Sequence, residues 1–159
     1  MTIRPAERRD LPAIVSLYAS DELHGGSEPG PNIAPGCDIL AGYVAAFEQM
    51  ADDPNNSVYV AEQAGAVVGT CQLTFIRQLS YGGCLVAQLE SVYVKAEQRS
   101  HGVGQRLIEN AIATARQRGA LRIQLTTNLK RVRAHRFYER LGFRATHHGM
   151  KLYLEDRES

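Results

Sequence analysis

The stretch Arg99–Gly104, which reads Arg-Ser-His-Gly-Val-Gly, is the most informative part of this 159-residue chain. It follows an apolar, strand-like segment, Leu85–Val94, and it leads into a segment with the spacing of an amphipathic helix. The apolar face of that helix consists of Val103, Leu107, Ile108, Ala111, Ile112 and Ala115. A strand, a glycine-containing loop and a helix form a site for phosphate, because the first N–H groups of a helix have no intrahelical acceptor and carry partial positive charge. Gly102 and Gly104 lack the Cβ atoms that would hold a phosphate away from the backbone.

Two common nucleotide-binding motifs do not fit this loop. The dinucleotide fingerprint G-x-G-x-x-G is absent, and no Gly-Lys-Ser/Thr follows as it would in a P-loop. Arg-x-x-Gly-x-Gly after a Val-rich strand instead resembles the pyrophosphate loop of the GNAT superfamily of N-acetyltransferases. A second block, Ala134–Phe143, resembles the late helix of that family and its Leu-Gly-Phe exit. The two motifs in this order, about 30 residues apart with a strand between them, form a fairly specific pair.

The periodicity of apolar residues predicts a chain that alternates between strands and helices. The expected strands are Thr2–Pro5, Ser57–Glu62, Val67–Leu79, Cys84–Val94, Leu121–Thr127 and a last one within Phe143–Leu154, clearest at Met150–Leu154. The expected helices are one capped by Asp10 with Leu11, Ile14, Val15 and Tyr18 as its buried stripe, Ile39–Met50, the helix after the glycine loop, and Arg131–Leu141. We therefore expect one α/β (α+β) domain over residues 1–159. The resemblance implies a GNAT-like acyl-CoA N-acyltransferase fold, with a mixed central sheet flanked by helices on both faces.

Charge is distributed unevenly along the chain, although the net charge is only +1. The segment Lys95–Arg144 holds 12 Lys or Arg against 3 Glu, a net charge of +9, and the rest of the chain carries −8. This asymmetry favours an anionic ligand on the C-terminal half. Solvated helix faces would explain many of these arginines equally well. Nucleic acid is the weaker interpretation of the same patch, because no nucleic-acid-binding motif accompanies it.

The composition also limits the cellular compartments and the kinds of chemistry that fit this chain. The three cysteines are odd in number and have no C-x-x-C spacing, and His147 and His148 lack the spacing of helical metal ligands. These patterns predict free thiols in a reducing compartment and no metal. No signal-peptide-like start and no membrane-spanning apolar run is present, so we expect a cytoplasmic protein without a membrane partner.

Glu90 is the candidate general base. It lies in a mostly apolar strand, where partial desolvation would raise its pKa and make it a better base near neutral pH. The alternative is an ion-paired or edge-exposed glutamate with no catalytic role. The resemblance favours the base, because many family members place a glutamate on this strand that acts directly or through water. Some members carry Glu-Asp here, whereas this chain has Glu90-Ser91, which speaks against a sugar-phosphate acceptor.

Tyr138 is the candidate general acid. From the residues alone it is a packing residue beside Phe137 and Leu141 on a helix. The resemblance implies that a tyrosine at this place in Phe-Tyr-x-x-x-Gly-Phe donates a proton to the departing CoA thiolate.

The resemblance also implies a binding site for the co-substrate acetyl-CoA. Its expected residues are Val92, Tyr93, Val94, Arg99, Ser100, His101, Gly102, Val103, Gly104, Gln105, Asn128 and Arg131. Backbone groups of residues 92–94 would contact the pantetheine arm and steady the oxyanion. Arg131 stands where the family often has Asn, so Asn128 and Arg131 depart from the usual pattern.

These features predict an N-acetyltransferase that moves the acetyl group of acetyl-CoA to a primary amine. The acceptor, a small molecule or a peptide, is expected to enter beside the His24–Cys37 loop and the Ser80–Gly83 turn. Two alternatives remain: a different acyl-CoA donor, or a non-catalytic CoA-binding or protein-interaction module on the same fold. The acceptor and its class stay open, and so does a homodimer, which is common in the family.

Overall fold

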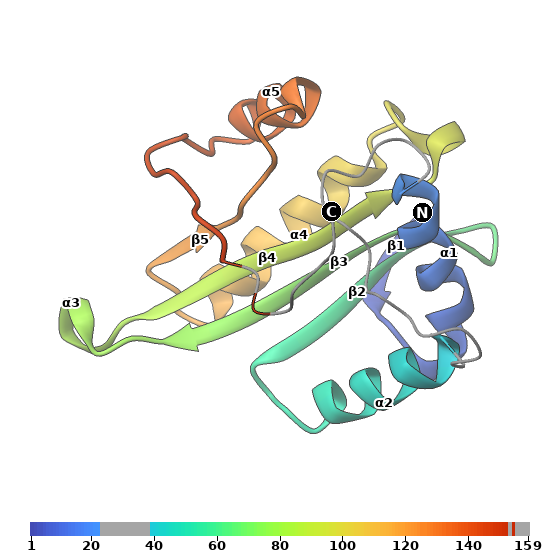
Figure 1. Cartoon of the computed structure of the whole chain (residues 1–159), viewed down its shortest axis with the longest axis horizontal. Helices are drawn as coiled ribbons and strands as arrows, with labels where there is room; N and C mark the ends of the chain where they lie inside the picture. The colour runs from blue at the N-terminus through green and yellow to red at the C-terminus, as the bar shows by residue number, and fades with distance from the viewer. Residues whose placement is uncertain (23–38, 153, 155–159) are drawn as a thin grey trace.

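The computed structural model describes residues 1–22, 39–152 and 154, and for residues 21, 22 and 39 only the backbone. Figure 1 shows a twisted sheet with helices on both faces. The strands are β1 Thr2–Pro5, β2 Asn56–Gln63, β3 Ala66–Arg77, β4 Leu85–Val94 and β5 Arg122–Gln124. The α-helices are α1 Leu11–Glu22, α2 Ile39–Ala51, α3 Ser80–Gly83, α4 Val103–Gln117 and α5 Val132–Arg140, and two 3₁₀ turns are η1 Arg8–Asp10 and η2 Ala96–Gln98. The mixed α+β fold expected from the sequence is confirmed.

The five strands lie in the order in which they occur along the chain. The pairs β1–β2, β2–β3 and β3–β4 are antiparallel, and β4–β5 is parallel. A parallel connection needs a crossover, and α4 provides it between β4 and β5. The β4–β5 ladder is short, with its last pair at Gln88 and Gln124, so the two strands separate beyond that point.

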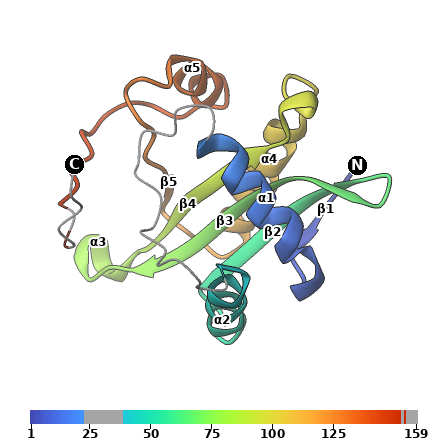
Figure 2. The same cartoon turned by 45° about the vertical axis from the view of Figure 1, so that its right-hand side comes forward.

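Two apolar clusters hold helices to the two faces of the sheet. On one face, α4 buries Val103, Leu107 and Ile108 against β3 and β4. On the other face, α1 buries Ile14 and Leu17 against β2 and β3. In Figure 2, α1 and α4 accordingly lie on opposite sides of the strands. The buried stripe of α1 was therefore predicted only in part, because Leu17 is buried and Val15 is only partly buried.

The expected last strand is wrong for the described part of residues 143–154. These residues form no ladder with β5, and Met150, Leu152 and Leu154 are 96%, 86% and 92% exposed. The expected strand at 121–127 shrinks to the three residues of β5. Alternation of apolar residues alone does not make a strand, because a strand also needs a partner along its length. The sharply shortened β5 offers little edge for pairing.

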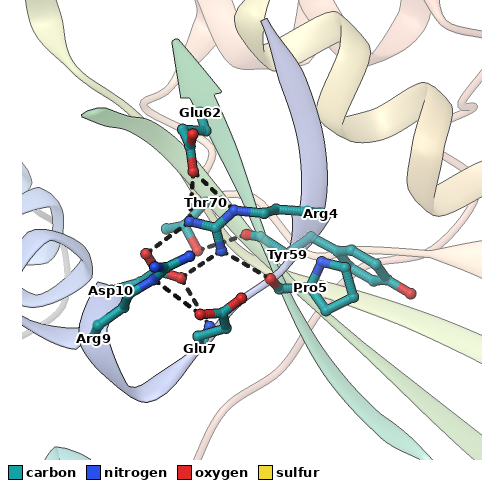
Figure 3. A network of polar contacts seen from close by, with 8 residues as sticks. All are labelled: Arg4, Pro5, Glu7, Arg9, Asp10, Tyr59, Glu62 and Thr70. Atoms are coloured by element: carbon teal, nitrogen blue, oxygen red, sulfur yellow. Dashed lines mark hydrogen bonds and ion pairs between the residues drawn. The ribbon is translucent and has the colours of Figure 1, made fainter. Parts of the chain in front are cut away.

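Arg4 on β1 connects three elements through a polar network (Figure 3). Its guanidinium contacts Asp10 at 2.7 Å and 3.0 Å, and it contacts Glu62 on β2 at 2.7 Å and 2.9 Å. Asp10 also accepts a hydrogen bond from the backbone N–H of Glu7, at 2.8 Å. The Asp10 carboxylate therefore closes a capping box around η1. Its hydrogen bonds to described residues go to Glu7 and Arg4 and not to an N–H of α1, so the cap expected for that helix is not found. The hydrogen bonds from Arg4 hold the pKa of the Asp10 carboxyl below its ordinary value.

We expect Asp10→Asn to lower the free energy of unfolding by about 1–2 kcal/mol at pH 7, a Tm loss of about 3–6 °C. Because folding lowers the pKa of Asp10, the stabilisation is complete above its unfolded pKa and is lost as the pH falls through its folded pKa. The difference between the two proteins should therefore shrink below about pH 4.

The control is Glu48→Gln, which removes the same charge from an exposed pair with Arg8 at 3.5 Å. In thermal melts, the Tm of Glu48→Gln should lie within about 1 °C of the wild-type Tm, both at pH 7 and below about pH 4. A pH-independent difference for Asp10→Asn would contradict the role given to this ion pair.

No helix in the described ranges combines the length and apolar character needed to span a bilayer.

Candidate active site

A pocket with a volume of ≈ 100 Å³ opens where β4 and β5 separate. Its walls are the C-terminal half of β4, the residues after β5, and the start of α5. The lining residues are Leu89, Glu90, Ser91, Val92, Tyr93, Leu125, Thr126, Thr127, Arg131, Ala134 and Tyr138. The structure thus brings together both residues singled out for proton transfer, Glu90 and Tyr138.

A β-bulge in β4 shapes this pocket. Thr70 pairs with Tyr93 and Gln72 with Glu90, so two residues of β4 stand opposite the single residue Cys71. One of the two, Ser91, has a φ of 50°, a conformation that costs a residue with a Cβ roughly 1–3 kcal/mol. Such bulges bend a strand and re-aim its side chains.

Glu90 is exposed, which corrects the expected partial desolvation of its carboxylate in an apolar strand. The strand is apolar on the face that packs under α4, but Glu90 belongs to the other face, next to the half-buried Gln72 and Gln88. No hydrogen bond or ion pair to a described residue occupies the Glu90 carboxylate. The carboxylate is therefore open to a ligand in the pocket.

Tyr138 projects from α5 into the aromatic cluster that borders the pocket. Its ring lies 5.1 Å from that of Phe137 and 5.7 Å from that of Phe143, both in edge-on geometry. Burial raises the pKa of Tyr138 above its ordinary value, against a smaller lowering by the charge of Arg131. The phenol is thus protonated at neutral pH, as a proton donor must be.

The glycine loop has the geometry of an anion site. Ser100 and Gly102 have φ angles of 65° and 81°, and Gly102 is the N-cap of α4. The N–H of Arg106 bonds to the Gly102 carbonyl at 3.1 Å. The N–H groups of Val103, Gly104 and Gln105 precede this first helical bond, so they have no helical acceptor. They point out of the helix start with its partial positive charge.

Other predicted binding residues are used within the protein. The Arg99 side chain donates to the carbonyl of Val94 at 3.2 Å, and the His101 ring contacts the carbonyl of Arg99 at 2.8 Å. Gln105 donates to Glu109 at 2.8 Å, on the surface of α4.

Asn128 lies outside the set of pocket-lining residues, whereas Arg131 lies within it. The Oδ1 of Asn128 accepts the N–H of Lys130 at 2.9 Å in a turn. The side chain of Asn128 is thus used in a local turn, and the expected contact between Asn128 and the CoA arm stays a prediction.

Several site residues escaped the sequence reasoning. Ser91, Thr126 and Thr127 line the pocket because of the bulge and the early end of β5. The ring of Tyr18 on α1 packs against that of Tyr93 at a tilt of 57°, with 4.9 Å between ring centres, and burial raises the pKa of Tyr18 to about 12. No local sequence pattern signals a β-bulge. The Glu90-Ser91 pair within an apolar strand can be read from the sequence, but it does not identify the bulge. The His24–Cys37 loop expected beside the acceptor lies outside the described residues.

A cysteine nucleophile does not fit this site. Cys71 is fully buried, and desolvation raises the pKa of its thiol to about 12. The reactive thiolate form is therefore scarce at neutral pH. In the described part of the chain, no three His, Cys, Asp or Glu side chains come together as metal ligands would.

Comparison with known proteins agrees with this geometry. The model of the acetyltransferase (GNAT) family matches residues 28–143, which include the bulge, the glycine loop and Tyr138. The chain therefore belongs to the acetyltransferase (GNAT) family, a family of acyltransferase enzymes.

Three relatives illustrate the range of the likeness. The chain is 35% identical to the aminoalkylphosphonate N-acetyltransferase of Salmonella typhimurium over 60% of this chain and only 61% of that protein. It is 32% identical to an uncharacterised N-acetyltransferase of Mycobacterium bovis, over 72% of each chain. The crystal structure of a transcriptional regulator from Bacillus halodurans C-125 superposes with a TM-score of 0.84 at 38% identity, covering 96% of this chain and 99% of that one.

Proposed function

We propose that this protein transfers the acetyl group of acetyl-CoA to a primary amine. The observation that carries the proposal is the pocket where β4 and β5 separate, because it holds together a carboxylate with no partner among the described residues and a half-buried phenol. Acetyl-CoA supplies the activated acyl group as a thioester. Family membership supports this donor and argues for catalysis over a purely binding module.

In this proposal Glu90 accepts a proton from the ammonium group of the acceptor, directly or through a water molecule. The neutral amine then attacks the thioester carbonyl. An accessible carboxylate suits this role, because it must reach both the acceptor and the solvent that carries the proton away. Val92 and Tyr93 line the same pocket, and the backbone groups of residues 92–94 are assigned to the developing oxyanion.

Tyr138 gives a proton to the sulfur as the carbon–sulfur bond breaks, and the second proton lost by the nitrogen as the amide forms returns to the phenolate, directly or through water. Its burial keeps the hydroxyl proton in place until the thiolate forms. The residue thus acts on the leaving group while Glu90 acts on the nucleophile, and the two line one pocket from different elements, α5 and β4.

The N–H groups at the start of α4 are assigned to the pyrophosphate of CoA. Arg131, on the α5 side of the pocket, is assigned to the same ligand. We also propose a reducing, cytoplasmic setting, which suits the free thiols of Cys71 and Cys84.

Binding of CoA tests the assignment of the loop. Saturating CoA should raise the wild-type Tm, because a ligand of the native state stabilises it by mass action. We expect Gly102→Ala to weaken CoA binding by about tenfold or more, since a Cβ would stand at the open face of the N–H groups. The measurement is titration calorimetry beside thermal melts.

Gly65→Ala is the matched control. Both glycines have positive φ, 81° and 78°, and a Cβ at either meets no atom within 4 Å. Both substitutions should therefore cost the free protein a similar Tm, but Gly65→Ala in the β2–β3 turn should bind CoA normally. A wild-type Tm that CoA leaves unmoved would count against the proposed function itself.

A further inference from the structure

A row of polar side chains extends from the pocket across the face of the sheet that is turned away from α4. It consists of Gln72 and Thr74 on β3, Gln88 and Glu90 on β4, and Gln124 on β5. Gln72 pairs across the strands with Glu90, and Thr74 pairs with Gln88. Gln88 in turn pairs with Gln124. We call these five residues the polar floor.

Hydrogen bonds within the polar floor leave particular groups open. The Nε2 of Gln72 contacts Oγ1 of Thr74 at 3.4 Å, and the Nε2 of Gln124 donates to Oε1 of Gln88 at 3.0 Å. Among the described residues, nothing bonds to Oε1 of Gln72, to Nε2 of Gln88 or to the carboxylate of Glu90. The floor therefore offers an uncharged acceptor, an uncharged donor and one negative charge.

The long segment that forms most of the elements around the polar floor carries no positive charge, although Arg77 ends β3. Residues 10–76 contain no Lys or Arg and nine Asp or Glu. This segment forms α1, α2, β2 and nearly all of β3. Residues 23–38 belong to it in sequence and therefore add no Lys or Arg, although their structure is not described.

Two cations of the described residues, Arg122 and Arg131, border the polar floor or the pocket. Arg122 on β5 donates to Gln124 at 3.0 Å and to Gln78 at 3.4 Å. It pairs with Val86, four residues before Glu90 along β4, so about 13 Å of strand separates the backbone positions of the two pairs. Arg131 lies on the α5 side of the pocket, beside Tyr138, and is assigned to CoA in the proposed function.

We propose, resting on the proposed acetyl transfer, that the acceptor is an amine without an anionic group, whose other polar groups are hydroxyls or further amines. Glu90 faces its reacting amine, while Gln72 and Gln88 bond its other polar groups. A phosphate or phosphonate a few bonds from that amine would approach the Glu90 carboxylate, while Arg122, which contacts the floor, is held by Gln124 and Gln78. The class thus differs from the aminoalkylphosphonates named for the Salmonella relative.

Matched acceptor pairs test this class directly. Ethanolamine is compared with O-phosphoethanolamine, and glucosamine with glucosamine 6-phosphate, by thiol release from acetyl-CoA and by calorimetry on the CoA-saturated protein. We expect the phosphate-free member of each pair to be favoured by about tenfold or more, both in kcat/KM and in affinity. Equal values, preference for the phosphorylated members, or no binding of any of the four compounds would overturn the proposal.

The two readouts separate this inference from the function on which it rests. Acetylation of the phosphorylated members at rates equal to or above those of their phosphate-free partners would overturn the acceptor class and leave acetyl transfer standing. Preferential binding of the phosphate-free members without any acetyl transfer would support the acceptor class and count against the proposed function.

A charge placed on the floor gives a second test. Gln88→Lys should shift the ratio of affinities for O-phosphoethanolamine and ethanolamine toward the phosphorylated member by about tenfold. Gln117→Lys adds the same charge at the exposed end of α4, on the other face of the sheet, and should leave the ratio unchanged. Equal shifts in the two variants would mean that net charge, not the floor, selects the acceptor.

Discussion

Glu90→Gln is expected to lower kcat/KM by about 10²-fold or more at neutral pH while CoA affinity stays near the wild-type value. The amide keeps the shape of the side chain but cannot take a proton from the acceptor. Because an alkyl ammonium has a pKa near 10, almost none of it is a free amine at pH 7 without a base. At higher pH the solvent itself supplies the free amine, so the deficit of the variant should narrow toward pH 10. Steady-state rates from pH 6 to pH 10 measure this closing gap.

The matched control for Glu90→Gln is Glu48→Gln, an exposed glutamate on α2 with the same change of charge. Its rate should follow the wild type over the whole pH range. A constant deficit in Glu90→Gln, parallel to the wild-type profile, would make Glu90 a residue that binds the acceptor and not its base. An unchanged rate would remove it from the reaction altogether.

The sequence could predict the fold because its strongest signals are local. The helix α4 has strict amphipathic spacing and a glycine N-cap, and its predicted face, from Val103 to Ala115, is the buried face in the structure. The antiparallel strands β2 and β3 are joined by a short turn and were predicted to within two residues at every end. The residue pattern that specifies such an element lies within the element itself and in the residues next to it.

The predictions that were wrong concern features that depend on partners distant in sequence. The length of β5 is set by where β4 bends away, and the bulge at Ser91 that bends it has no local signal. The segment with Met150, Leu152 and Leu154 alternates like a strand, but it finds no partner strand in the described structure. The exposure of Glu90 has the same origin, because the face to which a strand residue belongs depends on register.

The sequence predicted which residues line the candidate site better than it predicted the exposure and neighbours of those residues. Glu90, Tyr138 and Arg131 all line the pocket, although they lie on two elements far apart in sequence. The family motif carried that inference, since no spacing rule joins a strand at residue 90 to a helix at residue 138. The polar floor could not be predicted from the sequence, because Gln72 and Gln124 become neighbours of β4 only through strand pairing.

Tyr138→Phe should lower kcat at saturating acetyl-CoA by about 10²-fold, because a thiolate leaving group loses its proton donor. The ring that packs at 5.1 Å and 5.7 Å from its neighbours remains, so the Tm and CoA affinity should change little. A donor must be protonated, so wild-type activity should fall as the pH rises through the pKa of Tyr138, which burial raises above its ordinary value of 10. The variant should lack that alkaline decline.

Tyr59→Phe removes a phenol from β2, away from the pocket, and serves as the matched control that should keep both the wild-type rate and the alkaline decline. The comparison of rates requires that the chemical step limits turnover. The absence of a pre-steady-state burst establishes this, because a burst would place the slow step after acetyl transfer. With chemistry limiting, a wild-type rate in Tyr138→Phe would make Tyr138 a packing residue of the Phe137–Phe143 cluster. The thiolate would then leave unassisted or take its proton from water, and the raised pKa of Tyr138 would reflect only its burial in that cluster.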